Sequence, residues 1–353
     1  MTEAQREEQI VHFLAQHGHG NSRRSHLTGD ASTRAYELIE PADGPNLILM
    51  NAPAQPDGPP IRDGKPYSQI AHLAEDMHAF AAVAQRLQGN GIRVPDILAQ
   101  DLELGLLLIE NLGTGGIITP EREPISERYL AAMETLAAIH DCQWQREVEL
   151  DKGAVHRLPE FDRDAILIEV DLLAQWYAPY RLGGPLATAR YDEFVAIWGD
   201  LATEIEAAEK SILLRDYHSP NIIWMDDASG TDRTALIDFQ DALWGPTAYD
   251  VASIAQDARI SVPAALEQQL VAHYLAHRRD IDRAHFERCY PVLAAQRATK
   301  VAGIFVRLAE RDGKPNYLAH LPHVEDYLKR SIAHPRLADY RNWLQAVLSL
   351  SPA

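Results

Sequence analysis

The chain has 353 residues, of which 46% are hydrophobic and 24% are charged, a composition that excludes an intrinsically disordered protein. At this length, two lobes or domains are expected. The 51 acidic and 33 basic residues give a formal net charge of −18, which argues against nucleic acid or an anionic membrane as a partner. No apolar stretch approaches the ~20 residues of a membrane helix, and Cys142 and Cys289 form no disulfide framework. We therefore expect a cytoplasmic, monomeric protein of enzyme size.

The first third of the chain, residues 1–111, reads as a small sheet with one packed helix. An amphipathic helix is predicted at about residues 3–16, followed by a strand, a turn at Gly29 and Asp30, and a second strand within "SHLTGDASTRAYELIE". Further strands are predicted at "NLILM", "VPDILAQD" and "LGLLLIENLG". Apolar residues at three- and four-residue steps from Ile70 to Leu87 predict one helix with a single buried face.

In the remainder of the chain, residues 112–353, the spacing of apolar residues predicts mainly helices. Two segments are exceptions, "ILLRDYHSPNIIWM" and "TALIDFQDALWG", which are joined by the turn "DDASGTDR". Each has a short apolar run next to polar residues, so we expect a strand pair beside a loop. The whole chain is therefore predicted to have an α+β fold.

These two segments contain three oxygen-bearing side chains with a spacing that suits phosphoryl transfer. Asp216 is followed five residues later by Asn221, as in the H-R-D-x-x-x-x-N loop of kinases, and Asp238 holds the place of the aspartate in D-F-G. Asp216 could accept the proton of an attacking hydroxyl, while Asn221 and Asp238 could hold Mg²⁺. Such residues in a loop also serve as turn or capping residues. Gln240 replaces the glycine of the D-F-G triplet, which argues against a flip at that point.

In several segments the sequence resembles the aminoglycoside phosphotransferase-like kinases, and among them the bacterial kinases of N-acetylmuramic acid and N-acetylglucosamine. The segments are "LTGDASTRAYEL", "LMNAP", "VPDILAQDLELGLLLIENLG", "LRDYHSPNIIW" and "LIDFQDALWGPTAYDVASIAQDAR". The resemblance implies a two-lobed protein-kinase-like fold, ATP, Mg²⁺ and a sugar acceptor phosphorylated at its anomeric hydroxyl in peptidoglycan recycling. It also implies that Asp216 is the catalytic base and that Asn221 and Asp238 are metal ligands.

One departure concerns the lysine that kinases of this superfamily carry on the third strand. Met50 lies in that neighbourhood, and Arg34 and Lys65 are the nearest cations along the chain. Arg34 is better placed, because a guanidinium can bind two phosphate oxygens at once, although an exposed strand arginine is an equal alternative. Ser32 and Thr33 could offer amides and hydroxyls to the phosphates, or merely belong to a hairpin turn.

Other polar residues are candidates for binding adenine or the acceptor. Backbone groups around Glu110 and Leu112 lie where a kinase hinge would contact adenine. Asp250 precedes an apolar helical run, so it either caps that helix or braces the 216 loop. His140 is expected to be a core histidine. The candidates for binding the acceptor sugar are Glu169, Asp171, His218 and Asp241.

Two alternative functions remain open at this point. An acidic lower lobe also suits polycationic aminoglycosides or another small-molecule hydroxyl acceptor. The missing strand lysine is compatible with a catalytically inactive kinase fold that only binds nucleotide. Retention of Asp216, Asn221 and Asp238 together argues against an inactive fold, because a binding module needs neither a proton acceptor nor two metal ligands.

Overall fold

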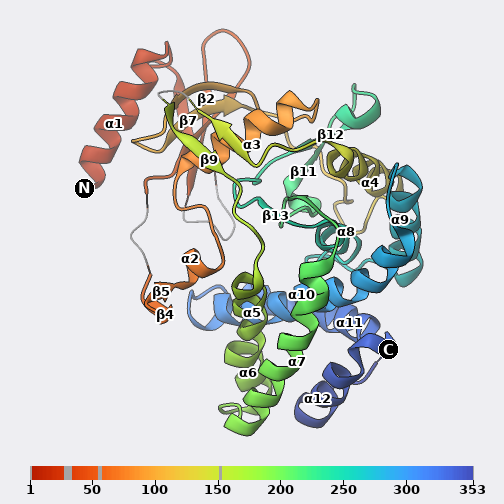
Figure 1. The fold of residues 1–353 in the computed structure, drawn as a ribbon. Helices are drawn as coiled ribbons and strands as arrows, with labels where there is room; N and C mark the ends of the chain where they lie inside the picture. The colour runs from red at the N-terminus through yellow and green to blue at the C-terminus, as the bar shows by residue number, and fades with distance from the viewer. Residues whose placement is uncertain (1, 28–33, 55–57, 151–152, 353) are drawn as a thin grey trace.

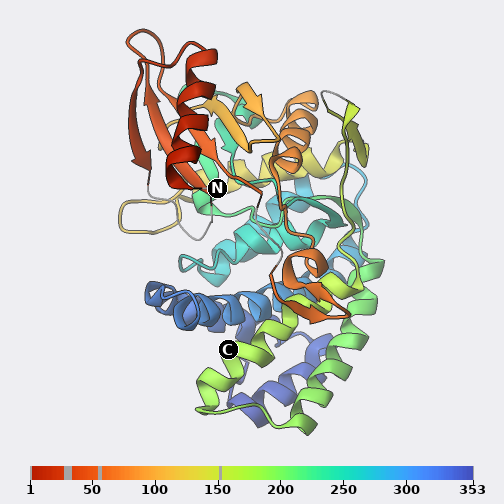
Figure 2. The same cartoon turned by 90° about the vertical axis from the view of Figure 1, so that its left-hand side faces the viewer.

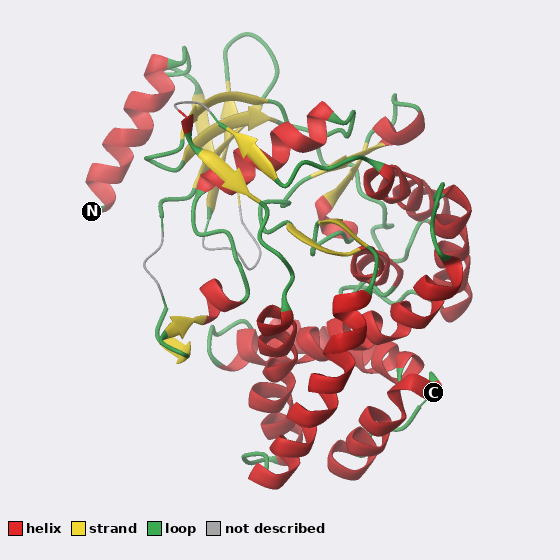
Figure 3. Ribbon diagram, viewed as in Figure 1, coloured by secondary structure: helices red, strands yellow, loops and turns green. Residues whose placement is uncertain are grey.

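The computed structural model describes residues 2–27, 34–54, 58–150 and 153–352. It has an α+β architecture: the five-stranded sheet lies at one end of the molecule and most of the helices lie at the other (Figures 1 and 3). This arrangement confirms the predicted fold class.

The N-terminal part is built on a five-stranded antiparallel sheet with the strand order β1-β2-β3-β7-β6. All five strands overlap the segments predicted from the sequence, although β1 begins two residues before its segment and β3 ends one residue after its own. Their bounds are β1 (Arg23–Leu27), β2 (Ala35–Glu40), β3 (Leu47–Asn51), β6 (Ile97–Asp101) and β7 (Leu106–Glu110).

Helices cover both faces of this sheet. Successive strand side chains point to opposite faces, so Leu47 and Leu49 of β3 pack with helix α1 (Glu3–Gln16). Met50 lies on the other face, in the core that contains Phe80 of helix α3 (Met77–Gly89). The sheet therefore has an apolar core with a helix on each face, whereas the sequence predicted only one helix packed on the sheet.

The helix predicted from Ile70 to Leu87 is interrupted in the structure. Helix α2 (Tyr67–Ile70) ends after one turn, and α3 starts seven residues later, with Asp76 as its N-cap. The Asp76 carboxylate accepts a hydrogen bond from the His78 amide at 2.8 Å, which fixes the new start. Ahead of α2, a short hairpin forms from β4 (Pro60–Arg62) and β5 (Lys65–Pro66).

Helix α10 (Arg283–Glu310) runs through the centre of the helical part and packs against α5, α8 and α11 (Figures 1 and 2). It passes so close to α5 that only glycine fits at the crossing: a Cβ built on Gly303 would lie 2.3 Å from the carbonyl carbon and oxygen of Leu172. The other helices are α4 (Ser126–Asp141), α5 (Arg163–Leu172), α6 (Ala178–Leu182), α7 (Thr188–Ala207), α8 (Thr247–Ala255), α9 (Ala264–His277), α11 (Leu321–Ser331) and α12 (Ala338–Leu348), with a π-helical turn, η2 (Leu173–Tyr177), between α5 and α6.

Two strand pairs are embedded among these helices. Strand β10 (Lys210–Leu213) pairs with β13 (Leu243–Pro246), and β11 (Ile222–Trp224) pairs with β12 (Thr234–Leu236). The sequence indicated one pair beside a loop. The loop between β10 and β11, residues 214–221, contains the predicted catalytic residue. A further small hairpin joins β8 (Glu147–Glu149) and β9 (Val155–Arg157).

The chain passes from the sheet to the helices just after β7, and one continuous apolar core contains residues from both sides of this point. A division into residues 1–111 and 112–353 remains a proposal. Among the described residues, no helix is both long enough and apolar enough to cross a membrane.

Replacing Gly303 by alanine should destabilise the protein, because the new methyl group would overlap the backbone of Leu172. Overpacking of this kind typically costs about 1–3 kcal/mol. Gly199, inside α7, is the matched control: a Cβ there would meet only a flexible arginine tip at 3.9 Å. Gly199→Ala should therefore be neutral or stabilising by up to about 1 kcal/mol, the usual helix-propensity gain. Chemical denaturation of both variants tests this, and equal effects would contradict the assignment of Gly303 to a close helix crossing.

Candidate active site

The 214–221 loop is held at its start by the carboxylate of Asp250. One oxygen accepts a hydrogen bond from the Leu214 amide at 2.7 Å, and the other accepts one from the Arg215 amide at 2.8 Å. Asp250 lies within α8, whose N-cap is Pro246, so Asp250 braces the loop and does not cap the helix. Of the two interpretations of Asp250, the structure therefore supports bracing.

Asp257 holds the other end of the same loop and was not identified from the sequence. Its Oδ2 accepts hydrogen bonds from the Ser219 amide at 2.8 Å and from the Tyr129 hydroxyl at 3.2 Å. Asp257 lies two residues beyond the end of α8, directly after the C-cap residue Gln256, so helical periodicity from Asp250 does not place it. No local sequence signal identifies it as the second anchor.

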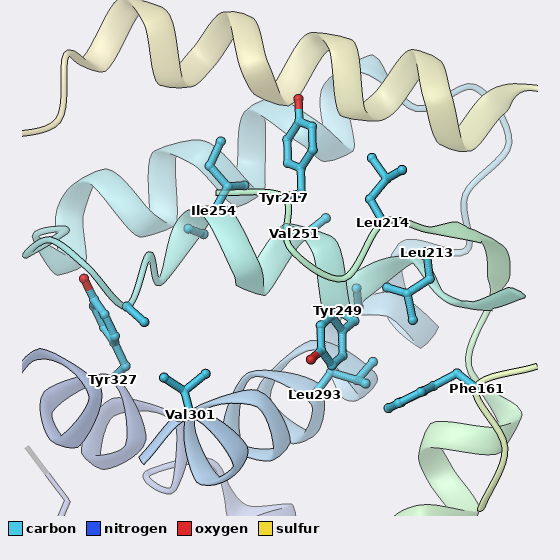
Figure 4. Close-up of a cluster of buried hydrophobic side chains, with 14 of the residues drawn as sticks. Phe161, Leu213, Leu214, Tyr217, Tyr249, Val251, Ile254, Leu293, Val301 and Tyr327 are labelled. Atoms are coloured by element: carbon cyan, nitrogen blue, oxygen red, sulfur yellow. The ribbon is translucent and has the colours of Figure 1, made fainter. Parts of the chain in front are cut away.

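Two buried tyrosines, Tyr217 of the loop and Tyr249 of α8, connect this region to α4 and α10. Figure 4 shows Tyr217 pointing from the loop to α4, where its hydroxyl donates to the Ala132 carbonyl at 2.7 Å. Tyr249 points from α8 to the other side, toward α10, where its hydroxyl accepts a hydrogen bond from the Lys300 ammonium at 2.9 Å. Because both tyrosines are buried, the loop has little freedom to move as a unit.

Arg215 adopts a left-handed conformation, with φ of +70°, a strained geometry for a residue with a long side chain. Its buried guanidinium is paired with the carboxylate of Glu169. Glu169 is also contacted by the Gln296 amide and the Lys300 ammonium, each at 2.9 Å. Glu169 therefore belongs to a buried charged cluster behind the loop, and its predicted contact with the acceptor sugar remains a prediction.

The three residues predicted for phosphoryl transfer converge at one place. The Asn221 side-chain amide donates to the Asp216 carbonyl at 3.0 Å, and the Asn221 carbonyl accepts a hydrogen bond from the Ile237 amide at 3.0 Å. Because Asp238 directly follows Ile237, the second bond places Asn221 beside Asp238. The β11–β12 pairing starts directly after Asn221, so it sets the position of both segments.

The two carboxylates of this group have pKa values shifted in opposite directions. Burial alone would raise the pKa of Asp216, but neighbouring positive charges lower it below its usual value. His218 is one of these neighbours, yet burial lowers its own pKa to about 4, so at neutral pH the permanent charges are those of Lys300, Arg215 and Arg297. Burial and the nearby Asp216 charge raise the pKa of Asp238. Asp216 is therefore stabilised in its ionised form, whereas Asp238 carries a carboxylate whose charge a nearby cation would stabilise.

Arg34 reaches this centre from the sheet. Its Nη1 lies 3.3 Å from Oδ1 of Asp238, which also accepts a hydrogen bond from the Gln240 side chain at 2.9 Å. The structure therefore brings Arg34, and not the exposed Lys65 of the β4–β5 hairpin, to the predicted metal ligand. Met50 is buried in the core. Ser32 and Thr33 lie outside the described residues.

The predicted hinge follows the end of β7. The Glu110 carboxylate pairs with the Arg93 guanidinium and accepts a hydrogen bond from the Asp96 amide at 3.3 Å. Leu112 is partly exposed just beyond the strand. The Glu110 side chain is thus used to fix the strand end, and adenine contact by the backbone here remains a prediction.

The other residues predicted to bind the acceptor lie in different places, two of them beside the site and one in a separate pocket. His218 is buried, and its Nε2 lies 3.2 Å from the Asn221 side-chain amide. Asp241 accepts a hydrogen bond from the Ala74 amide at 2.6 Å, which ties the segment after α2 to the site. Asp171 lines a separate pocket of ≈ 470 Å³ with Arg62. His140 is a buried core residue, as expected.

Substituting Asp250 by asparagine should loosen the start of the loop without affecting its end. The asparagine side chain is uncharged and has one acceptor oxygen, so it cannot replace both charge-assisted hydrogen bonds of the carboxylate. We therefore expect the free energy of unfolding to fall by about 1.5–3 kcal/mol. Hydrogen exchange followed by mass spectrometry should show faster exchange at Leu214 and Arg215. Asp257→Asn is the matched variant and should expose Ser219 instead. The same exchange pattern in both variants would contradict separate anchoring.

Comparison with known proteins places the chain in a family. Residues 24–287 match the model of the phosphotransferase enzyme family. An N-acetylmuramate/N-acetylglucosamine kinase of Caulobacter vibrioides is 33% identical over 350 residues, covering 96% of each chain. A Pseudomonas aeruginosa protein with the same name is 31% identical, covering 88% of this chain and 85% of its own.

Solved structures share the fold at much lower identity. A choline kinase from Streptococcus pneumoniae superimposes with a TM-score of 0.58 at 14% identity, covering 90% of this chain and 98% of its own. The ADP-bound aminoglycoside phosphotransferase APH(2'')-Ib gives 0.54 at 14% identity, covering 92% and 97%. The kinase-like fold is thus shown by structure and the family by sequence: the chain belongs to the phosphotransferase enzyme family.

Proposed function

We propose that this protein is an ATP-dependent kinase that phosphorylates N-acetylmuramic acid or N-acetylglucosamine at the anomeric hydroxyl, in the cytoplasm, as a step of peptidoglycan recycling. The observation that carries the kinase activity is the convergence of Asp216, Asn221 and Asp238 on one loop and the adjacent strand end. The choice of sugar is supported by relatives of that name at 30–33% identity.

Asp216 is proposed as the group that takes the proton of the acceptor hydroxyl. Burial would favour the protonated form of this carboxyl, but the neighbouring positive charges offset that effect and lower its pKa, so the carboxylate is ionised and can accept a proton. The backbone on both sides of Asp216 is anchored by Asp250 and Asp257, which limits the positions that its carboxylate can take. Such positioning is the main contribution that a protein makes to phosphoryl transfer.

Asn221 and Asp238 fit a Mg²⁺ site. Hard cations prefer carboxylate and amide oxygens, and the raised pKa of Asp238 beside a second carboxylate is the electrostatic situation that a cation relieves. When bound, Mg²⁺ would neutralise charge on the nucleotide phosphates. Arg34, already 3.3 Å from Asp238, is proposed to contact those phosphates in place of the missing strand lysine.

A pocket of ≈ 320 Å³ beside Gln240 is the proposed location of the acceptor. One wall of this open pocket is the segment after α2, which the Asp241 carboxylate holds through the Ala74 amide. Gln240 itself donates to Asp238, so a sugar in this pocket would lie next to the metal ligand. Its polar lining, which suits a neutral sugar with hydroxyl and amide groups, includes Ser68, Gln69, His72, Glu75 and Asp76.

Asp216→Asn should reduce turnover by about 10²–10⁴-fold, the usual contribution of a positioned proton acceptor. Magnesium-dependent ATP binding, measured by calorimetry, should change little, because the two proposed metal ligands remain. Asp227→Asn, at an exposed position, is the control and should keep normal turnover. Wild-type turnover in Asp216→Asn would end the assignment of the base.

The acceptor and the position of transfer can be tested directly. Incubation with MgATP and either amino sugar should give a sugar 1-phosphate, recognised by phosphorus–proton coupling to the anomeric hydrogen in NMR. Aminoglycosides serve as parallel substrates. Phosphate on an aminoglycoside, or at the 6-hydroxyl with none at the anomeric position, would reject the proposed acceptor while leaving the phosphotransferase activity intact.

A further inference from the structure

A second group of potential metal ligands lies between α4 and α9. Glu134 on α4 and His273 and His277 on α9 each offer one ligand atom, and these atoms all lie within 4.8 Å of one another. None of the three belongs to the candidate active site. Within the described residues, this is the one group of three or more histidine, cysteine, aspartate or glutamate side chains with such spacing.

The two histidines form a chelating pair by helical geometry. Residues four apart lie on the same helix face, and the ring centroids of His273 and His277 are 4.2 Å apart. Glu134 completes the group from the neighbouring helix, with Oε1 3.0 Å from Nε2 of His273. Because α4 and α9 pack against each other, the three side chains are brought together by the fold.

Two of the three ligands already have the outer contacts that orient metal ligands. His277 Nδ1 lies 2.8 Å from the backbone carbonyl of His273; when it donates there, the lone pair of Nε2 is free for a metal. Glu134 Oε2 accepts a hydrogen bond from the Arg233 guanidinium at 3.0 Å, which leaves Oε1 facing the histidines. Such outer hydrogen bonds, from a ligating imidazole to a carbonyl and to a ligating carboxylate, are typical of protein metal sites.

We propose that Glu134, His273 and His277 bind a late first-row divalent ion of the Zn²⁺ class, with water completing the coordination. Two imidazoles and a carboxylate suit Zn²⁺, Ni²⁺ or Cu²⁺, whereas Mg²⁺ prefers oxygen ligands only. Tetrahedral Zn²⁺ needs ligand atoms about 3.3 Å apart, given bonds of about 2.0 Å. All three side chains reach the surface, so their rotation can bring the ligand atoms to this spacing. His273 would then carry its ring proton on Nδ1, which leaves Nε2 free to bind the ion.

Occupancy of this site would link two helices that support the 214–221 loop. Helix α4 carries Tyr129, which contacts Asp257, and α9 carries Tyr274, which lies 2.8 Å from Nδ1 of His140. The other ring nitrogen of His140 lies 3.6 Å from the Asp250 carboxylate. A bound ion would therefore stabilise the helix pair behind the loop without contacting the reacting groups. Ligands that bind only the folded state raise the melting temperature by mass action.

The test uses the full chain without a histidine tag, after treatment with a chelator. Calorimetry with ZnCl₂ in excess Mg²⁺ should give one ion per chain, and Co²⁺ should give the visible absorption of a low-coordinate site. His277→Ala and Glu134→Gln should each weaken Zn²⁺ binding at least tenfold and abolish the Zn²⁺-induced rise in melting temperature. His12→Ala, which removes an exposed histidine on α1, is the matched control and should bind as the wild type does.

Several outcomes would overturn the proposal. They are the absence of stoichiometric Zn²⁺ binding, full competition by millimolar Mg²⁺, or unchanged affinity in both His277→Ala and Glu134→Gln. Because the three side chains lie at the surface, all variants should fold, and far-UV circular dichroism verifies this. Equal weakening in His12→Ala would indicate nonspecific binding and would also reject the site.

Discussion

The candidate active site depends on how two carboxylates, one on α8 and one just beyond its end, satisfy the buried amides of the 214–221 loop. An irregular loop inside a protein leaves backbone donors without partners, and each unsatisfied donor costs about 1–3 kcal/mol. Asp250 and Asp257 accept three of these donors between them, those of Leu214, Arg215 and Ser219. The loop therefore has a fixed shape although only its last residues, Ser219–Asn221, form a short 3-10 helix, and the position of Asp216 follows from that shape.

Fixing the loop in this way places charge in the interior, and the surrounding residues compensate for it. Arg215 must adopt a left-handed backbone, and its side chain then points into the core, where Glu169 neutralises it. Lys300 on α10 contacts the same carboxylate, so the cluster of Glu169, Arg215 and Lys300 has an excess of positive charge. Buried ion pairs contribute little net stability compared with apolar packing. Their presence behind the loop is better explained by the field they produce, which keeps Asp216 ionised in an otherwise acidic protein.

The sequence predicted the features that depend on local pattern. All five strands of the sheet, helix α1, and the spacing of Asp216, Asn221 and Asp238 could be read from alternation, helical periodicity and short motifs. The break before α3 could not, because the apolar periodicity continues through it and only the Asp76 cap reveals it. Residues that act from a distance were also missed. Lys300 lies on a helix 84 positions after Asp216, and Glu134 lies 139 positions before His273, so nothing in the local sequence connects them.

The packing of the sheet explains why the third strand carries no lysine at the position of Met50. Position 50 carries an apolar side chain in the core that includes α3, so a cation there would have to be buried or break that contact. Arg34 precedes the first residue of β2, and the register Ala35↔Asn51 places that strand start beside the end of β3. A guanidinium from this point reaches Asp238 over the edge of the sheet. A cation supplied from the strand end lets the sheet keep two apolar faces and still puts positive charge where the nucleotide phosphates are proposed to bind.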